Sequence, residues 1–366
     1  MKNNNKVLAQ YKYEPGEIDK GYTGRTLYVN ISDNTISPKP VTQMMKEKFI
    51  GGKGFGLWYL WNATTPNTKW DDPENEIIIA GGPACGITQY AGTGKSLVCS
   101  ISPLTDIPID SNVGGYFGPL LKFSGWDAIE IQGKSDKEII VYIDGNKSLV
   151  TIEEAPAGAF DAHILGEQLT EMYADNEEDK RNVAVVTAGT GAEHSRFGIL
   201  NFTFYDPRRQ TARLKQAGRG GIGTVFRNKK IKAVIVKFSS VKGNLNNAFD
   251  QSIINKTGIK YHKEIHDLDH MQNNMRKIGT ANIIEVMDAY DLLPVMNFQY
   301  GSHPDTQKIK STVFIEKYLT QGVQDGCWYG CSMACAKAAD NFLIKTGPYK
   351  GYRVTVDGPE YENAAG

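Results

Sequence analysis

Between Tyr22 and Phe238 the chain alternates short apolar, β-rich runs with glycine-rich turns. Runs of this length, bounded by turn residues, are typical of strands. We predict strands at residues 26–31, 76–80, 96–101, 128–131, 139–143, 183–187 and 231–236, and a hairpin turn at 144–146. Apolar residues at helical spacing predict helices at 44–49, 56–61, 117–123 and 163–174. This part of the chain is therefore predicted to be mostly sheet, interrupted by a few helices.

The composition changes after Lys242. Asn, Lys, Met and His become frequent, strand signals fade, and residues 246–287 are predicted to be helical, punctuated by Gly258 and Gly279. We therefore predict a boundary near residue 240, with one domain at 1–240 and a mostly helical domain at 241–366. The sequence stops directly after a dense motif at 358–362, so we expect the second domain to be incomplete.

Charge and hydropathy exclude two classes of partner. The 366 residues include 41 Lys and Arg against 41 Asp and Glu, and no long run of one sign offers a nucleic-acid or membrane-surface footprint. No stretch approaches the ~20 apolar residues of a membrane span, and residues 1–20 lack the apolar core of a secretory signal. We therefore expect a cytoplasmic protein that binds neither nucleic acid nor membrane.

Three of the five cysteines, Cys327, Cys331 and Cys335, are spaced four residues apart. On a helix this spacing would align the thiols along one face, and in a loop they could wrap a metal cluster. In a reducing compartment such a group suggests an iron–sulfur cluster. A buried apolar stripe and a zinc site are the alternatives, although no histidine lies close by to serve zinc. A cluster would need a fourth ligand from beyond residue 366, another chain, substrate or solvent.

The glycine-rich segment at 218–223 has the spacing of a dinucleotide fingerprint. Such a fingerprint follows a strand and opens a helix. Here the segment follows the polar stretch 211–216 and precedes the strand at 231, so we discount a Rossmann site. Its first four residues, Gly218, Arg219, Gly220 and Gly221, form either a cradle for another phosphate-bearing cofactor or a simple turn.

One lysine and a second glycine-rich loop are further candidate anion contacts. Residues 93–96 resemble part of a P-loop, but Gln89 stands where that motif needs a glycine. Lys95 is then either a solvated loop charge or an anion contact. Asn112, Gly114 and Gly115 precede a predicted helix whose amino terminus could attract an anion, although close packing of helix on sheet would need the same glycines.

Two carboxylates lie near the end of the sequence. Glu360 and Glu362 would point to the same side of a strand and could face one site. An isolated carboxylate is more often a solvated surface group than a catalyst, so a role for either depends on the motifs around it.

Taken in chain order, these segments resemble the aldehyde:ferredoxin oxidoreductase family. The matching segments are residues 24–30, 51–56, 80–83, 102–105, 114–118, 121–123, 125–133, 217–223 and 232–234, the cysteine group and residues 358–362. No single motif is decisive, but the ordered series is specific and extends from Gly21 to Gly366.

The resemblance implies an α+β fold in which an amino-terminal domain of two sheets, flanked by helices, is followed by part of a mostly helical domain. The first domain would carry a tungsten (or molybdenum) bis-pterin cofactor. Members of the family oxidise an aldehyde or related carbonyl compound to the acid and pass electrons through a 4Fe-4S cluster to ferredoxin or another electron-transfer protein. Some relatives instead reduce an aromatic thioester within a larger complex. The chain is thus expected to be an oxidoreductase with a small aldehyde-type substrate.

The resemblance also implies roles for individual residues. Cys327, Cys331 and Cys335 would be three of the four cluster ligands. Lys95 stands where the family has an arginine that bridges cofactor and cluster. The loops that hold the pterin phosphates would contain Asn112, Gly114, Gly115, Gly218, Arg219, Gly220 and Gly221. Glu362 matches a glutamate near the metal, which would act as a general base or a hydrogen-bond donor.

The chain departs from the family pattern in several places. The step from Cys327 to Cys331 is one residue longer than usual, so the first ligand would be displaced or its loop bulged. Lysine at position 95 replaces a planar five-donor fork with a point charge, and residues 205–210 are an insertion without an assigned purpose. The family's fourth cysteine, its later aspartate motifs and its active-site histidine belong to a carboxy-terminal half that this sequence lacks. We therefore expect either a second chain that supplies that half, or a truncated, non-catalytic or assembly subunit.

Overall fold

The chain forms two compact units in the computed structural model, which describes residues 5–158, 160–239, 241, 245–272, 274–296, 298–317 and 326–357. The first, here called the sheet unit, comprises residues 1–87 and 93–251, and the second, the helical unit, comprises residues 88–92 and 252–366. Two multi-stranded sheets and several helices make up the sheet unit, which confirms the predicted α+β fold class. The domain limits of 1–240 and 241–366 stay a prediction.

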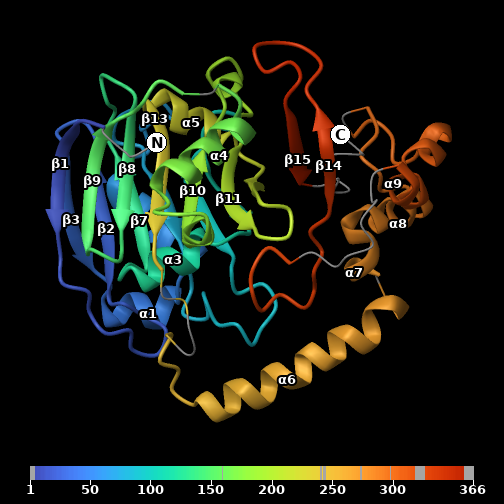
Figure 1. Ribbon diagram of the computed structural model, residues 1–366, viewed down its shortest axis with the longest axis horizontal. Helices are drawn as coiled ribbons and strands as arrows, with labels where there is room; N and C mark the ends of the chain where they lie inside the picture. Colours follow the sequence, from blue (N-terminus) through green and yellow to red (C-terminus); the bar gives the residue numbers. More distant parts are fainter. Residues whose placement is uncertain are drawn as a thin grey trace. The chain divides into compact units, whose positions relative to one another are not determined.

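A seven-stranded sheet forms one layer of the sheet unit (Figure 1). In spatial order its strands are β1 (Val7–Lys12), β9 (Leu149–Glu154), β8 (Ile139–Asp144), β13 (Ile231–Lys237), β10 (Val183–Thr187), β11 (Leu200–Asp206) and β12 (Thr211–Ala217). Strands β8 and β13 are parallel, and every other neighbouring pair is antiparallel. The central strands β10 and β13 are buried along their whole length because both faces of the sheet are covered.

A six-stranded sheet forms the other layer. Its spatial order is β3 (Thr35–Pro40), β2 (Arg25–Asn30), β7 (Ala128–Gln132), β4 (Ile77–Ala80), β5 (Ser96–Ile101) and β6 (Pro108–Val113). Strands β2 and β7 are parallel and the remaining pairs are antiparallel. The edge strands of the two sheets contact each other, β1 with β3 and β6 with β12. The β6–β12 contact determines where the 218–221 loop lies.

Short helices fill and cover the two layers. Helix α5 (Ile222–Asn228) contacts strands of both sheets, and every residue of α3 (Phe117–Phe123) is buried. Helices α1 (Gln43–Phe49) and α2 (Lys53–Ala63) pack together, and α2 packs on β4 and β5. Helix α4 (Ala162–Tyr173) packs on β10 and β12. The turns η1 (Glu178–Asn182) and η2 (Thr190–Glu193) are 3₁₀ helices.

One stretch that we expected to be a polar loop is a strand. Residues 211–216 belong to β12, which pairs with β11 along its whole length. The prediction was wrong because the polar side chains of this strand are buried with partners. The fully buried Arg213 donates to Asp206 Oδ2 at 3.1 Å, and Arg209 reaches the same oxygen at 2.6 Å. The insertion at 205–210 is therefore the tip of the β11–β12 hairpin.

The helical unit contains shorter elements. They are α6 (Gln251–Leu268), η3 (Asp269–Met271), α7 (Met275–Ile278), η4 (Gly279–Asn282), α8 (Ile283–Ala289), η5 (Pro304–Lys308), α9 (Ser311–Lys317), β14 (Ala338–Leu343) and β15 (Arg353–Asp357). A small core is built around Ile278, Ile284 and Phe314. The antiparallel pair β14–β15 adds two strands to this part of the chain, which we predicted to be mostly helical. Within the described ranges, no helix combines the length and apolarity needed to cross a bilayer.

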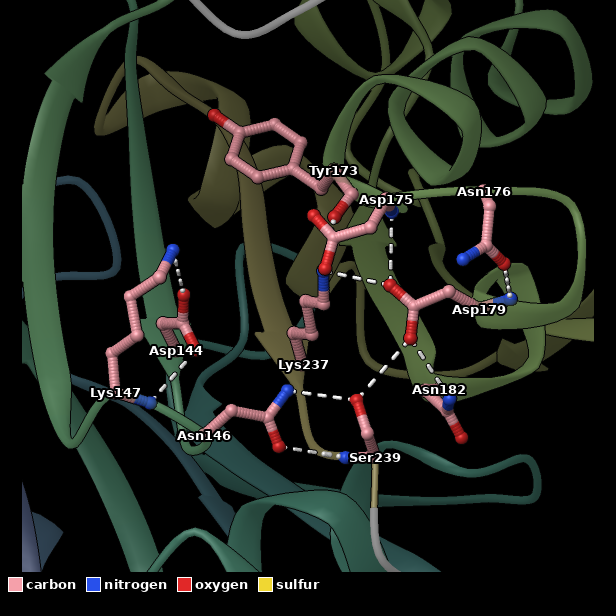
Figure 2. Close-up of polar contacts among 10 residues, drawn as sticks. All are labelled: Asp144, Asn146, Lys147, Tyr173, Asp175, Asn176, Asp179, Asn182, Lys237 and Ser239. Atoms are coloured by element: carbon pink, nitrogen blue, oxygen red, sulfur yellow. Dashed lines mark hydrogen bonds and ion pairs between the residues drawn. The ribbon is translucent and has the colours of Figure 1, made fainter.

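A buried ion pair ties the carboxyl ends of α4 and β13 together (Figure 2). The Lys237 ammonium, whose side chain is only 4% exposed, lies 2.7 Å from Asp179 Oδ2 and 2.8 Å from Asp175 Oδ2. It also donates to the Tyr173 carbonyl at 3.2 Å, where the carboxyl end of a helix favours a cation. Burial alone would lower the pKa of Lys237, but the two carboxylates outweigh it and raise the pKa.

We expect Lys237→Met to lower the stability of the chain by about 2 kcal/mol. The loss falls short of the ~3–5 kcal/mol of a fully broken buried pair, since Asp179 keeps hydrogen bonds from Asn182 and Ser239. At 2–4 °C per kcal/mol, the midpoint of thermal unfolding should fall by roughly 4–8 °C by circular dichroism. The control is Lys6→Met, an exposed lysine whose partner Glu154 keeps its ion pair with Lys137, and its unfolding midpoint should not change measurably. Equal losses in the two variants would contradict this assignment.

Candidate functional site

The start of β5 and the end of β6 bring two of the predicted loops together. Ser96 pairs with Val113 and Leu97 with Asn112, so Lys95 lies opposite the residues that follow β6. Lys95 and Asn112 are exposed, whereas Gly114 and Gly115 are buried. The loop residues predicted from 93–96 and 112–115 therefore share one end of the six-stranded sheet.

The 218–221 loop reaches the same strand through Arg219. The backbone amide of Arg219 donates to Ser111 Oγ at 3.2 Å, and its Nε donates to the Asp110 carbonyl at 2.8 Å. The guanidinium also lies 3.3 Å from Asp110 Oδ2. These contacts span more than a hundred residues of sequence and bring the loop after β12 to the middle of β6.

Asp110 holds a second cation as well. Lys53, the first residue of α2, lies 2.7 Å from Asp110 Oδ1. Partial burial alone would raise the pKa of Asp110, but the hydrogen bond and charge of Lys53, together with Arg219, outweigh it and hold the pKa below its ordinary value. Asp110 is thus ionised at neutral pH and orients two cations. Nothing in the sequence next to Asp110 marks it as the residue that orients both cations.

The surface formed by Lys53, Lys95, Asn112, Gly218 and Arg219 is here called the glycine-loop face. The side chains of Lys53 and Arg219 are 57% and 66% exposed although both are paired with Asp110. Lys95 and Gly218 are exposed too. Three cations set among glycine-rich backbone are suited to bind an anionic group such as a phosphate.

The glycines at 220 and 221 have a structural reason to be glycine. Their φ angles are +77° and +67°, and a Cβ on Gly221 would lie 2.1 Å from the Arg196 carbonyl oxygen. Contrary to our expectation, the loop follows a strand, β12, and opens a helix, α5. It is still not a Rossmann fingerprint, because β12 and β13 run antiparallel within the sheet and so form no parallel βαβ unit.

The three clustered cysteines lie in the helical unit, in a loop rather than on a helix. Residues 326–337 consist of turns, bends and short bridges, with Cys331 N donating to the Trp328 carbonyl at 3.1 Å. Cys327 is buried, and Cys331 and Cys335 are half-buried. Among the described residues, no three His, Cys, Asp or Glu side chains are grouped so that they could hold a metal ion. Glu362 lies outside the described residues.

Two models of one protein family match the chain. Residues 26–238 match the family model described as "Aldehyde ferredoxin oxidoreductase, N-terminal domain", and residues 256–366 match "Aldehyde ferredoxin oxidoreductase, domains 2 & 3". The chain belongs to the aldehyde ferredoxin oxidoreductase family. The family resemblance predicted from the ordered motifs is thereby confirmed.

Individual relatives in this family are about twice as long. The chain is 29% identical over 344 residues to a tungsten-containing aldehyde ferredoxin oxidoreductase of Pyrococcus horikoshii, covering 94% of this chain and 51% of that protein. It is 30% identical over 343 residues to the protein of the same description from Pyrococcus furiosus, covering 94% and 52%. The chain therefore spans about half the length of these relatives.

A solved structure shares the fold. It is described as the active site complex BamBC of benzoyl coenzyme A reductase in complex with 1,5-dienoyl-CoA. The superposition has a TM-score of 0.64 at 22% sequence identity, and covers 93% of this chain and 49% of that chain. This likeness supports the fold of the aldehyde ferredoxin oxidoreductase family and no more.

Proposed function

We propose that this chain is the cofactor-bearing amino-terminal part of a tungsten (or molybdenum) bis-pterin oxidoreductase that converts an aldehyde or related carbonyl compound to the acid. The observation that carries the proposal is the glycine-loop face. There Asp110 orients Lys53 and Arg219, and an exposed Lys95 directly precedes β5, the strand paired with β6. The tungsten-containing relatives make an anionic pterin cofactor the natural ligand of such a surface. Substrate, electron acceptor and any second chain are part of the proposal.

The residues of the glycine-loop face fit the phosphate of a pterin cofactor. Lys95 and Arg219 would supply charge, and the backbone around Gly114, Gly115 and Gly218 would supply amide donors. Lys95 can pair with one phosphate oxygen, but as a point charge it cannot reproduce a bidentate arginine. The cofactor, when bound, supplies the redox chemistry, and the protein's part is to hold and orient it.

The iron–sulfur cluster is a separate proposal. Its support is the spacing of Cys327, Cys331 and Cys335 within one loop and the family to which the chain belongs. The three thiols do not form a ligand group in the described residues, so no electron-transfer step is assigned to them. Glu362 as a general base or hydrogen-bond donor likewise stays a proposal.

The decisive experiment is anaerobic purification of the chain from its native host, with metal quantification and mass spectrometry of every protein that travels with it. We expect tungsten or molybdenum, about four irons per complex as in a 4Fe-4S cluster with cysteine ligands, and a second polypeptide that supplies the family's remaining half. A complex without either metal would overturn the proposal. The alternative, a non-catalytic truncated or assembly subunit, predicts co-purification with a partner but no pterin.

Loss of one cation from the glycine-loop face should weaken cofactor retention. A hydrogen bond between charged groups contributes ~1.5–3 kcal/mol, so Arg219→Ala should lower the tungsten content of the purified complex by roughly tenfold or more. Thermal stability should change little because the Arg219 side chain is 66% exposed. Lys137→Ala, an exposed cation that pairs only with Glu154 among the ion pairs of the described chain, is the matched control and should retain tungsten. Unchanged tungsten in Arg219→Ala would remove Arg219 from the binding surface.

A further inference from the structure

A buried lysine lies beneath the loops that surround the proposed cofactor surface. Lys122, in α3, is only 2% exposed. Its ammonium donates to the carbonyls of Gly21 at 2.7 Å and Pro83 at 3.2 Å, and also to that of Gly82. Lysine is almost never buried unless its charge is satisfied. Here the backbone of two loops satisfies it.

Asp127 binds the same two loops. Its carboxylate accepts the amides of Thr23 at 3.0 Å and Gly24 at 2.9 Å, and its own carbonyl accepts the amide of Gly81 at 3.2 Å. Burial lowers the pKa of Lys122, and the charge of Asp127 works against that shift. Lys122 and Asp127 thus form a buried pair of opposite charges whose bonds go to loop backbone.

The loop at 81–86 connects this pair to the glycine-loop face. The carbonyl of Gly81 accepts the amide of Gly52, the residue that caps α2 just before Lys53. The amide of Gly86 donates to the Thr93 carbonyl at 2.8 Å, and Cys85 Sγ lies 3.9 Å from the Lys95 carbonyl. Both Lys53 and Lys95 are therefore attached to the loop that Lys122 holds.

The geometry of the peptide group gives the buried ammonium a directional effect. A planar trans peptide points its carbonyl and its amide hydrogen in opposite directions. Because Lys122 draws the Pro83 carbonyl inward, the amide of Ala84 is directed away from it, and Ala84 is exposed. Asn246 reinforces this arrangement by donating to the Pro83 and Cys85 carbonyls at 3.3 and 2.8 Å.

We propose that Lys122 is a positioning residue for the cofactor: it holds the 81–86 loop so that Lys53, Lys95 and the Ala84 amide face one anionic group. The inference rests on the proposed function, since the anion is the pterin phosphate. Lys122 itself, being buried beneath the loop, acts through the backbone and touches no ligand.

The chain contains a matched control in Lys229, which is also 2% exposed and also donates to loop carbonyls, in this case those of Pro73 and Gly133. Pro73 precedes β4 and Gly133 follows β7, whereas Gly81 follows β4 and Asp127 precedes β7. The two lysines therefore lie at opposite ends of the same strands. A purely structural role predicts that Lys122→Met and Lys229→Met behave alike.

The experiment measures tungsten per chain and amide hydrogen exchange in both variants, purified anaerobically as the native complex. For Lys122→Met we expect about a tenfold loss of tungsten, which is the size of effect seen when a group that orients metal ligands is removed. We also expect faster amide hydrogen exchange in residues 81–95. Lys229→Met should lose a similar number of degrees of thermal stability yet keep its tungsten and its exchange rates in 81–95. Asn246→Ala, which removes no charge, should shift both readouts in the direction of Lys122→Met.

Equal tungsten loss in the two lysine variants, or wild-type tungsten in both Lys122→Met and Asn246→Ala, would overturn the inference. If Lys122→Met fails to fold, Asn246→Ala decides it by the same readouts. Wild-type complex without tungsten or molybdenum would instead refute the proposed function. In that case the exchange data still decide whether Lys122 holds the loop, and unchanged exchange in residues 81–95 overturns the inference.

Discussion

Gly221→Ala should lower the midpoint of thermal unfolding by roughly 10 °C or prevent folding, which corresponds to a loss of about 4 kcal/mol. Two effects combine at this position. The φ of +67° is strained for any residue with a Cβ, and that Cβ would lie 2.1 Å from the Arg196 carbonyl oxygen and 2.8 Å from Pro103 Cγ. Backbone cannot yield as a flexible side chain can, so the loop or the β12–α5 connection must move.

Gly218→Ala provides the comparison within the same loop. A Cβ on Gly218 would meet nothing within 4 Å, and its φ is not in the left-handed region. We expect thermal stability to change by less than the equivalent of about 0.5 kcal/mol. Circular dichroism of the two variants would thus show whether Gly221 is required for the turn while Gly218, which leaves open space for a ligand, is not. Equal stability of the two variants would contradict this division.

Much of the sheet unit was predictable from local pattern, because its central strands are apolar runs bounded by turn residues. All seven predicted strands have a counterpart, from β2 to β13, and the hairpin turn at 144–146 lies between β8 and β9. The edge strands β1, β3, β6 and β12 and the interior strand β11 carry mixed sequences and were missed. In β12 the alternation of apolar and polar residues that is typical of a strand is hard to recognise, because Arg213 is buried against Asp206 instead of facing solvent.

The site was predictable in its parts but not in its assembly. Lys95, Asn112 and Arg219 were proposed because each lies beside glycines in a recognisable motif, and their roles stay a prediction. Asp110, which holds Lys53 and Arg219, was not found because its partners are distant in sequence and its own surroundings carry no signal. The same holds for Lys122, whose role depends on carbonyls contributed by Gly21 and Pro83. Every residue has a backbone carbonyl, so residue types do not show which carbonyls will accept a hydrogen bond.

Glu76→Gln should stabilise the chain at pH 8 and flatten its dependence on pH. Glu76 is 1% exposed, Glu130 is fully buried, and each has one carboxylate oxygen without a hydrogen-bond partner among the described residues. Burial, and then the neighbouring Glu130, raises the pKa of Glu76 to about 8. Burial raises the pKa of Glu130 to about 7, although Lys39 at 2.7 Å opposes this. Glu130 lies in β7 of the six-stranded sheet, and Glu76 directly precedes β4.

The sign of the effect follows from proton binding. Between pH 4.5 and about 8 the folded chain keeps a proton on Glu76 that the unfolded chain releases, so the free energy of unfolding falls as pH rises through this window. The loss is on the order of 3 kcal/mol by pH 8, at ~1.4 kcal/mol per pKa unit and discounted for the coupling with Glu130. Glutamine cannot ionise, so the variant should lose most of the slope.

The measurement is the unfolding midpoint of the full chain at pH 5, 6, 7 and 8. The measured range should end at pH 8, because burial lowers the pKa of the nearby Lys229 to about 8. Above that pH the folded chain binds fewer protons at Lys229 than the unfolded chain does, so this titration makes the free energy of unfolding rise with pH. Glu74→Gln, an exposed carboxylate two residues away, is the control and should keep the wild-type slope. If Glu76→Gln also keeps that slope, Glu76 is ionised in the folded chain, and the charges of the half-buried Lys39 and the buried Lys229 must stabilise both carboxylates.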